Sequence, residues 1–307
     1  MTMHTTTLPT NHTPIHADTV SRNIQKAGLQ NIGEASIREI VKIVNNIEEE
    51  TGNKYIRMEM GVPGLKAPQV GIEAEKEALE RGAASKYPSI EGIPEFKREL
   101  SRFLKLFANK DIRPESCVPT VGSMQGGYAA FMVSGNARAG KDTTLFIDPG
   151  FPVQKQQHHL LGMNYESFDV YNYRGDKLKP KLQEYLEKGN IASIIYSNPN
   201  NPSWIAFTPK ELQIIAEMAD AYQVIVIEDL AYFGMDFRAD ISTPGQPPYQ
   251  PTVANYTDNY LLLISGSKSF SYAGQRIAGM AISDKLFKTR FPNLKKRFNT
   301  EAFGHAM

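Results

Sequence analysis

The chain has 307 residues, with 34 basic and 33 acidic side chains, a net charge of +1 and a single cysteine. A hydrophobic content of 41% is ordinary for a globular protein, the balanced charge excludes a general nucleic-acid binder, and one cysteine excludes an internal disulfide scaffold. No apolar run approaches the roughly 20 residues that span a bilayer, and no charged start leads into an apolar stretch as in a secretory signal. The length predicts about two domains. These properties favour a cytoplasmic α/β enzyme without a membrane or nucleic-acid partner.

The first hundred residues predict a polar tail followed by helices. Residues 1–20 are rich in Thr, His, Pro and Asn and lack hydrophobic periodicity, which predicts a disordered tail. Apolar residues then recur at helical spacing from Glu34 to Ile47, and Gly52 offers a C-cap. Two further helices are predicted over 71–82 and 93–107.

From residue 118 onward, strands and helices alternate. Short β-branched apolar runs predict strands, and most of these runs lack the alternation of a half-exposed strand. Strands are expected at 118–121, 144–147, 165–170, 192–196, 224–227, 260–264 and 277–282, and helices at 124–137, 180–188 and 209–221. Strands buried on both faces and separated by helices indicate a largely parallel sheet.

Four polar motifs directly follow predicted strands. They are the turn 122–127, the Asn-Pro loop 197–203, the acidic segment 228–232 and a Ser/Gly stretch that contains Lys268. Taken singly, a lysine at a strand end is most often a surface residue, an acid there often caps a turn, and Asn-Pro repeats form plain loops. Taken together they predict a site, because functional groups gather at the carboxyl ends of strands in open α/β sheets.

Each motif also suggests a specific chemistry. A lysine in a site where its amine loses a proton easily is suited to a Schiff base. The turn 122–127 exposes free backbone N–H groups at the start of a helix, which suits a phosphate, although it is neither a Walker loop nor a dinucleotide-binding glycine motif. No set of His, Cys, Asp and Glu at metal-ligand spacing completes a metal site.

The order and spacing of these motifs resemble the fold-type I aminotransferases that depend on pyridoxal 5′-phosphate (PLP), in the aspartate/aromatic aminotransferase class. The Ser-x-x-Lys element appears at 265–268 with Arg276 eight residues after the lysine, the Asp-x-x-Tyr element at 229–232, and the Asn-Asn-Pro loop at 200–202. The resemblance covers about Gly61 to Ser283. It implies an α/β fold, a three-layer sandwich with a mostly parallel central sheet, plus an incomplete small α+β domain.

The resemblance also implies roles for individual residues. Lys268 would form the internal aldimine and move the proton between the substrate Cα and the cofactor C4′. Asp229 would keep the pyridine nitrogen protonated, while Tyr232 and Asn201 would hydrogen-bond the phenolic oxygen. Arg276 would bind the phosphate with its planar guanidinium. Other cofactor and substrate contacts are implied for Ser123, Met124, Gln125 and Ser265 at the phosphate, Phe151 stacking on the ring, Tyr87 reaching the neighbouring subunit's phosphate in a homodimer, and Gly61 with Asn201 at the substrate.

The function implied is an aminotransferase that acts on an L-amino acid and a 2-oxo acid through pyridoxamine phosphate. A PLP-dependent lyase that performs β-elimination on the same fold, and a non-catalytic PLP-binding module, are the alternatives. The domains expected are a tail at 1–20, part of a small domain at 21–60, a PLP-binding domain at 61–290 and the start of a truncated small domain at 291–307.

Two departures from the family pattern stand out. Trp204, the only tryptophan, occupies the place where the family's Asn-Pro loop usually has glycine. The arginine that binds the substrate α-carboxylate in the family has no counterpart in this chain, which we expect to be cut short in its second domain.

Overall fold

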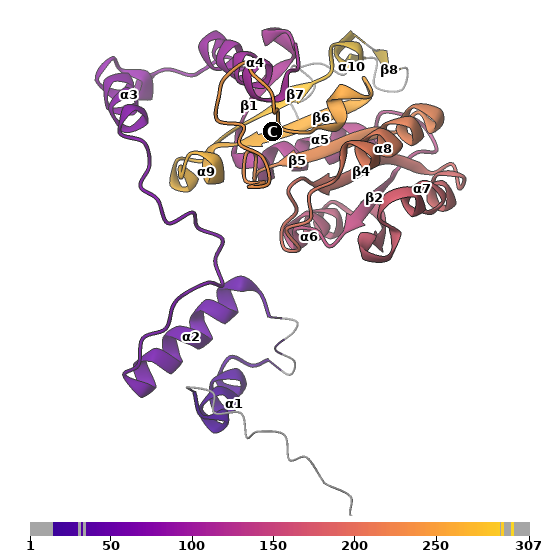
Figure 1. Ribbon diagram of the computed structural model, residues 1–307. Helices are drawn as coiled ribbons and strands as arrows, with labels where there is room; N and C mark the ends of the chain where they lie inside the picture. Colours follow the sequence, from indigo (N-terminus) through magenta and orange to yellow (C-terminus); the bar gives the residue numbers. More distant parts are fainter. Residues whose placement is uncertain (1–14, 30–31, 33–34, 289, 292–295, 298–307) are drawn as a thin grey trace, which may run out of the picture. The chain divides into compact units, whose positions relative to one another are not determined.

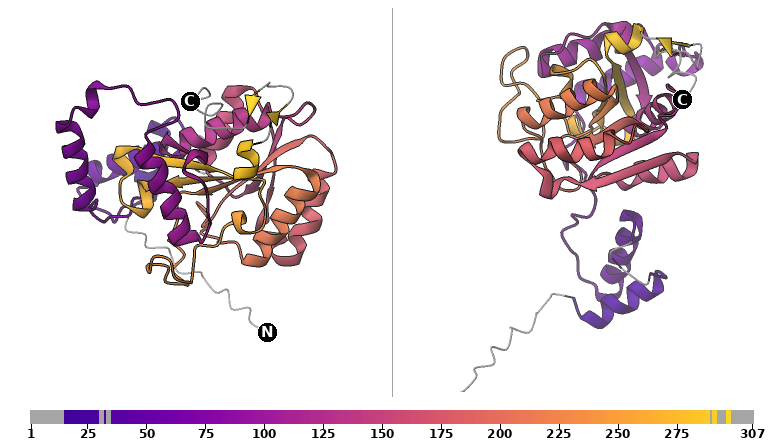
Figure 2. Two further views of the ribbon diagram at one scale, coloured as in Figure 1. Left: turned by 90° about the horizontal axis from the view of Figure 1, so that it is seen from above. Right: turned by 90° about the vertical axis from the view of Figure 1, so that its right-hand side faces the viewer.

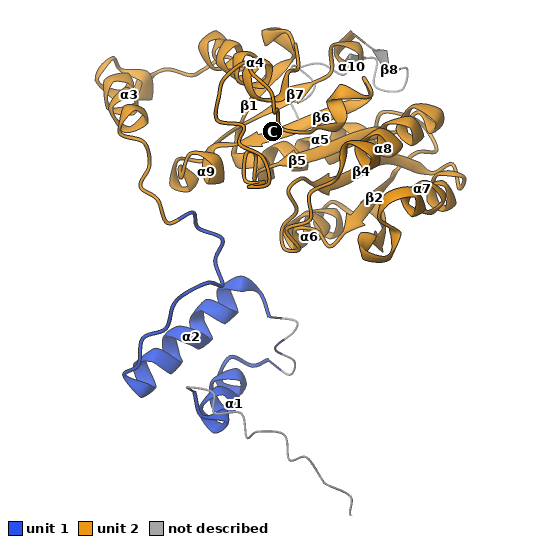
Figure 3. Cartoon of the chain, in the orientation of Figure 1, with its two compact units in different colours: residues 1–63 blue, residues 64–307 orange. Residues whose placement is uncertain are grey.

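The computed structural model describes residues 15–29, 32, 35–288, 290–291 and 296–297 (Figure 1). The chain divides into two compact units, Met1–Pro63 and Gly64–Met307 (Figure 3). Most of the predicted tail and of the predicted segment 291–307 lies outside the described residues. Within the described part of the chain, no helix is long and apolar enough to cross a membrane.

The first unit contains two helices, α1 (Ala17–Lys26) and α2 (Ile37–Thr51). Helix α2 begins with a capping box between Ser36 and Glu39 and ends at Gly52, whose φ of 73° gives the predicted left-handed C-cap. Helix α1 corrects the prediction for residues 17–20, which are helical instead of disordered. No apolar periodicity marks these residues, because the buried residues of α1 are the polar Thr19 and Asn23.

The second unit is built on a seven-stranded sheet with the order β1-β7-β6-β5-β4-β2-β3. All strands run in one direction except β7, which pairs antiparallel with both β1 and β6. The predicted strands are all present, with ends within about three residues of the prediction. They are β1 (Cys117–Val121), β2 (Thr143–Asp148), β3 (Asn164–Asp169), β4 (Ile191–Ser197), β5 (Ile225–Leu230), β6 (Tyr260–Ser265) and β7 (Ile277–Ile282).

Helices cover both faces of this sheet and complete three layers (Figure 2). Two apolar clusters separate the layers, one under α4, α7 and α8 and the other under α5 and α10. Their β-branched strand residues are almost fully buried, as expected for a mostly parallel sheet. The helices are α3 (Gln69–Glu80), α4 (Pro94–Ala108), α5 (Gly122–Gly135), α6 (Pro152–Leu161), α7 (Leu178–Leu186), α8 (Pro209–Tyr222), α9 (Gly266–Ser269) and α10 (Asp284–Lys288).

Short elements complete the described chain. Strands β8 (Arg290–Phe291) and β9 (Lys296–Arg297) form a separate two-stranded antiparallel sheet. The 3-10 turns are η2 (Ala83–Ser85), η3 (Pro114–Ser116), η4 (Val170–Tyr173), η5 (Gly175–Lys177), η6 (Val253–Asn255) and η7 (Ala273–Gln275).

Helix α6 was not predicted from the sequence. Its two buried side chains are Gln154 and His158, so the face that it turns to the core is polar and carries no hydrophobic period. His158 lies against the rings of Phe131 and Phe146, with centroid distances of 4.3 and 5.1 Å, which places α6 on the α5 side of the sheet.

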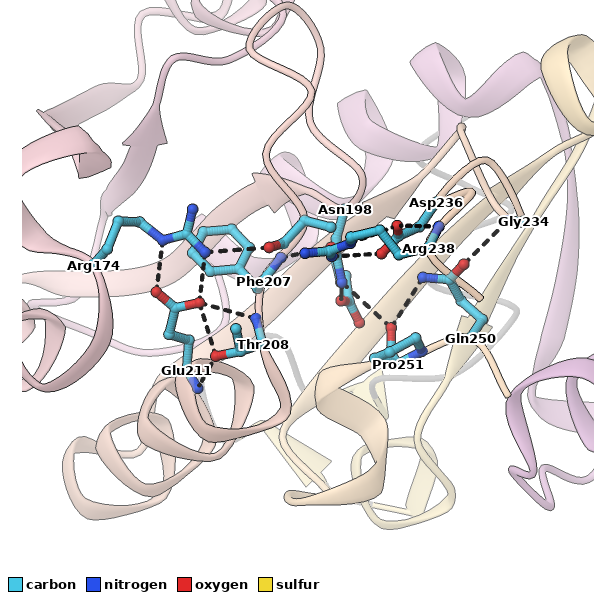
Figure 4. Close-up of polar contacts among 12 residues, drawn as sticks. Arg174, Asn198, Phe207, Thr208, Glu211, Gly234, Asp236, Arg238, Gln250 and Pro251 are labelled. Atoms are coloured by element: carbon cyan, nitrogen blue, oxygen red, sulfur yellow. Dashed lines mark hydrogen bonds and ion pairs between the residues drawn. The ribbon is translucent and has the colours of Figure 1, made fainter. Parts of the chain in front are cut away.

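A buried ion pair anchors the start of α8. The Arg174 guanidinium donates to both carboxylate oxygens of Glu211 at 2.6 Å, and a further Arg174 N–H donates to the Ala206 carbonyl at 3.2 Å (Figure 4). Thr208 and Glu211 form a capping box on the same helix. Burial raises the pKa of Glu211, but the hydrogen bonds from Arg174, Gly175 and Thr208 outweigh it and lower the pKa to about 2.

We expect Glu211→Gln to lower the free energy of unfolding by about 2 kcal/mol at pH 7, because it replaces charge-assisted bonds to a buried carboxylate. Since the folded-state pKa is depressed, this stabilisation is complete above the ordinary pKa of 4.5 and is lost as the pH falls toward 2. Urea denaturation at pH 7 and pH 3 measures the free energy of unfolding of variant and wild type. The difference between the two should be smaller at pH 3. The exposed pair of Arg98 and Glu95 provides the control Glu95→Gln, which should leave the stability nearly unchanged.

Candidate functional site

The polar motifs of the sequence meet at one edge of the sheet. The register pairs Ser197 of β4 with Asp229 of β5, Leu230 with Ile264 of β6, and Val121 of β1 with Ile277, the first residue of β7. The carboxyl ends of β1, β4, β5 and β6 therefore lie along the edge at which β7 begins. This is the edge at which ligands bind in open α/β sheets.

Asp229 is the buried acid of this edge, with 7% of its surface exposed. Its neighbours along β5 alternate between the two apolar clusters, so its side chain lies on the face covered by α5 and α6. It accepts hydrogen bonds from the Gln154 side-chain amide at 3.0 Å and the Ala231 N–H at 3.1 Å. Burial raises its pKa to about 6 despite these two neutral donors. A cation beside Asp229 would lower that pKa and stabilise the carboxylate.

Gln154 is a site residue that sequence reasoning missed. It lies on α6 three residues after Phe151, the N-cap of the helix, and three before Gln157, whose amide donates to the Met124 carbonyl at 3.2 Å. One face of α6 thus connects Asp229 with the start of α5. The spacing of Phe151, Gln154 and Gln157 at successive helical turns was the available signal, and it is legible only once the helix is known.

Arg276 lies against the start of α5. Gly122 has φ +77°, and a Cβ added to it would meet Arg276 Nη2 at 2.0 Å, so only glycine allows this approach. Arg276 Nη1 donates to the Ala273 carbonyl at 2.8 Å and to Ser267 Oγ at 3.4 Å. Ser265 Oγ caps α9 by accepting from the Ser267 N–H at 3.1 Å. A guanidinium, serine hydroxyls and the N-terminus of a 14-residue helix therefore converge, which is a donor set suited to phosphate.

Lys268 lies in α9, directly after β6. Burial, followed by the positive charge of Arg276, lowers the pKa of its amine below the usual value. An amine that loses its proton more easily is a better nucleophile toward a carbonyl. The structure thus gives Lys268 the electrostatic property that a Schiff base requires.

The Asn-Pro loop follows β4 and Tyr232 follows β5 at the same edge of the sheet. Ser197 Oγ accepts from the Asn201 N–H at 3.2 Å and from the Asn200 amide at 3.1 Å, which holds the loop to the end of β4. The pKa of Tyr232 is raised by burial and by the charge of Asp229, so its hydroxyl stays protonated and can donate a hydrogen bond.

Trp204 lies edge-to-face on Tyr232, with ring centroids 5.5 Å apart and an interplanar angle of 76°. Its φ of 59° is left-handed, a conformation that costs a bulky residue about 1–2 kcal/mol. The aromatic pair contributes about 0.5–1.5 kcal/mol beyond its area burial. The two contributions are of similar size, so net stability does not explain why a tryptophan stands here.

Other predicted residues are distributed as follows. Ser123, Met124 and Gln125 occupy the first turn of α5, where the Gln125 side chain accepts from the Val121 N–H at 2.6 Å. Tyr87 is fully exposed between η2 and α4, outside the cluster around Asp229. Gly61 belongs to the first unit. No group of three or more His, Cys, Asp and Glu suited to a metal occurs among the described residues.

These observations fit PLP at the edge of the sheet. Arg276, which lies against Gly122 at the start of α5, suits the phosphate, while the buried carboxylate of Asp229 suits a protonated ring nitrogen. Lys268 lies in α9, directly after β6, and β6 lies between β5 and β7 in the sheet.

Comparisons with known proteins agree with this geometry. The family model for aminotransferase class I and II matches residues 53–306. The chain is 26% identical over 259 residues to a probable aspartate aminotransferase of Methanocaldococcus jannaschii, covering 84% of this chain and 63% of that protein. It is 29% identical over 258 residues to the LL-diaminopimelate aminotransferase of Aquifex aeolicus, covering 83% and 64%. The chain thus spans just under two thirds of the length of these curated relatives.

The fold is similar to that of an alanine aminotransferase from Pyrococcus furiosus. The TM-score is 0.68 at 21% sequence identity, and the match covers 89% of this chain and 69% of that one. This likeness supports the three-layer architecture with its mostly parallel sheet.

We expect Asp229→Asn to stabilise the cofactor-free protein at pH 8. The folded-state pKa of about 6 lies above the ordinary 3.8, so the free energy of unfolding falls as the pH rises through this interval. Two pKa units correspond to roughly 3 kcal/mol, which is the upper bound of the gain. Urea denaturation at pH 8 should show a higher free energy of unfolding for the variant. At pH 4 the free energies of unfolding of the two proteins should differ little. Asp176→Asn, at a side chain with 81% exposure, is the control. A gain of equal size at both pH values would contradict the assignment to a buried charge.

Proposed function

The chain belongs to the aminotransferase class I and II family, whose members use PLP, and we propose that it transfers an amino group between an L-amino acid and a 2-oxo acid. One observation carries the proposal. The buried carboxylate of Asp229 lies near the end of β5, the Lys268 amine with its lowered pKa follows β6, and the Arg276 guanidinium against Gly122 precedes β7. These three strands are neighbours in the sheet.

The resemblance to the family implies a role for each residue. Lys268 would hold the cofactor through its aldehyde, and its amine would move the proton between the substrate Cα and the cofactor C4′. Asp229 pairs with the pyridine nitrogen, and Gln154 orients its carboxylate. Tyr232 and Asn201 donate to the phenolic oxygen. When bound, PLP supplies an electron sink that accepts the charge left by deprotonation at Cα.

The phosphate is held at the other end of the site. Arg276 provides charge and Ser265 a hydroxyl, while Ser123, Met124 and Gln125 offer the start of α5. Phe151, at the N-cap of α6, stacks on the pyridine ring. Asn201 would also contact the substrate.

The reaction proceeds in two half-reactions. An amino acid would bind first and a 2-oxo acid second, with bound PLP carrying the amino group between them, so ping-pong kinetics are expected. The relatives named for aspartate and LL-diaminopimelate make amino acids with an acidic group in the side chain the first donors to test. A reducing cytoplasm is the expected compartment, because Cys117 is the only cysteine and is a free thiol.

A homodimer is part of the proposal. Helix α3 has no buried residue, and its apolar residues Val70 and Leu79 are exposed. Tyr87, Ile90 and Ile93, in the segment that follows, are also exposed. Exposed apolar residues gathered in one segment are typical of an interface, and a second copy of the chain is the partner that would bring Tyr87 to a neighbouring phosphate.

The central test is reductive trapping. Protein loaded with PLP should be yellow, and borohydride should attach the cofactor irreversibly to Lys268, as located by peptide mass spectrometry. Lys268→Ala should bind PLP without covalent attachment. A loaded wild type that gains no mass on Lys268 would contradict the proposed site.

A donor panel with 2-oxoglutarate separates the reaction types. Pyridoxamine phosphate formation identifies transfer, and ammonia release identifies β-elimination. Neither product with any donor favours a binding module. A version of the chain extended at its C-terminus, tested in parallel, shows whether the 307 residues suffice for turnover.

Hybrid dimers test the placement of Tyr87. Tyr87→Phe should weaken PLP binding about tenfold, the effect of one lost hydrogen bond to a charged group. In a dimer of one Tyr87→Phe chain and one Lys268→Ala chain, one site regains both residues and should recover wild-type affinity, read as PLP fixed by borohydride at limiting cofactor. A hybrid with the weak affinity of Tyr87→Phe, or a monomer in sedimentation, would rule out the neighbouring-subunit role.

A further inference from the structure

The indole of Trp204 lies in an unusual place for so large a side chain. It is the only tryptophan, its backbone is left-handed with φ 59°, and 47% of its surface is exposed. A left-handed position favours glycine, so a tryptophan here is retained against a local backbone preference. A half-exposed indole also gains only part of the benefit of burial.

Hydrogen bonds within the Asn-Pro loop hold this backbone in place. The Trp204 N–H donates to the Asn200 carbonyl at 2.9 Å, and the Asn200 N–H donates to the Ile205 carbonyl at 2.8 Å. Ser203 Oγ donates to Asn200 Oδ1 at 2.7 Å. The loop therefore presents the indole from a rigid frame, and the same frame carries Asn201.

The indole contacts Tyr232, whose hydroxyl we assign to the cofactor's phenolic oxygen. The edge-to-face geometry at 5.5 Å and 76° restricts the Tyr232 ring from the side of the Asn-Pro loop. As estimated above, the ring contact and the backbone strain nearly offset each other in stability. The contact thus has its consequence in the position of the tyrosine.

We propose that Trp204 is a positioning residue, which holds the Tyr232 ring so that its hydroxyl donates to the phenolic oxygen of bound PLP. The proposal rests on the cofactor site proposed above and adds to it a residue that acts through Tyr232. It requires no contact between Trp204 and the substrate.

The consequence is visible in the cofactor's own titration. A phenolic oxygen that accepts a strong hydrogen bond from Tyr232 is a weaker partner for the proton on the nitrogen that links Lys268 to the cofactor. Loss of that bond lets the nitrogen hold its proton to higher pH. The midpoint pH of the visible absorbance band therefore reports how well Tyr232 is placed.

We expect Trp204→Gly to raise that midpoint by roughly half a unit to one unit, the size of one aromatic contact expressed on the pH scale. Trp204→Phe, which keeps an aromatic ring, should stay near the wild-type value. Tyr171→Ala, which removes an aromatic side chain with 75% exposure outside the site, should not move it. Trp204→Ala serves as the second ring-deleting variant if the glycine variant does not fold.

A double variant separates positioning from a general structural effect. In a Tyr232→Phe background the hydroxyl is already gone, so adding Trp204→Gly should cause no further shift. A full shift in that background would overturn the proposal, as would a loaded Trp204→Gly protein that titrates like the wild type. A wild type that shows no visible band would instead overturn the cofactor site itself, so the two failures are distinguishable.

Discussion

The burial of Asp229 is the constraint on which the rest of the site depends. A carboxylate with 7% exposure and only neutral donors carries a desolvation cost, which appears as a pKa raised to about 6. Gln154 of α6 offsets part of that cost through its hydrogen bond to Asp229. In the proposed site, the cationic ring nitrogen of the cofactor would offset the remainder. The proposed ligand would then supply the charge that the protein alone lacks beside Asp229.

A second buried acid lies on the opposite face of the same strand. Glu228 is fully buried, and burial raises its pKa to about 7 although Thr252, Asn198 and the Val253 N–H donate to it. Asn198 also donates to the Pro251 carbonyl, which accepts from Gln250 as well, and Gln250 in turn accepts from the Gly234 N–H (Figure 4). This network joins the Asn-Pro loop to the segment after Tyr232. The ring contact of Trp204 joins the same loop to Tyr232 itself.

The sequence predicted the sheet well because its central strands β4, β5 and β6 are buried, largely apolar runs. It predicted the site motifs because each lies at or just after the end of a strand. It missed α1 and α6, whose buried faces are polar: Thr19 and Asn23 in one, Gln154 and His158 in the other. Hydrophobic periodicity does not register such faces. Gln154 was missed together with its helix. Its partner Asp229 lies 75 residues away in the chain, so only the fold brings the two together. The domain limits and the neighbouring-subunit role of Tyr87 stay predictions.

Two large side chains of the site, Arg276 and Trp204, extend from left-handed backbone with φ of 57° and 59°. Strain of this kind persists only where the surrounding structure over-determines it. Arg276 donates a hydrogen bond to the Ala273 carbonyl and occupies space that a side chain at position 122 would fill. Trp204 is held by the hydrogen bond from its N–H to the Asn200 carbonyl. In both places an extended or helical backbone would cost less but would aim the side chain elsewhere. The left-handed backbone at these two positions thus lowers stability slightly and directs two side chains. The Arg276 guanidinium lies at the proposed phosphate site, and the Trp204 indole lies beside the tyrosine assigned to the phenolic oxygen.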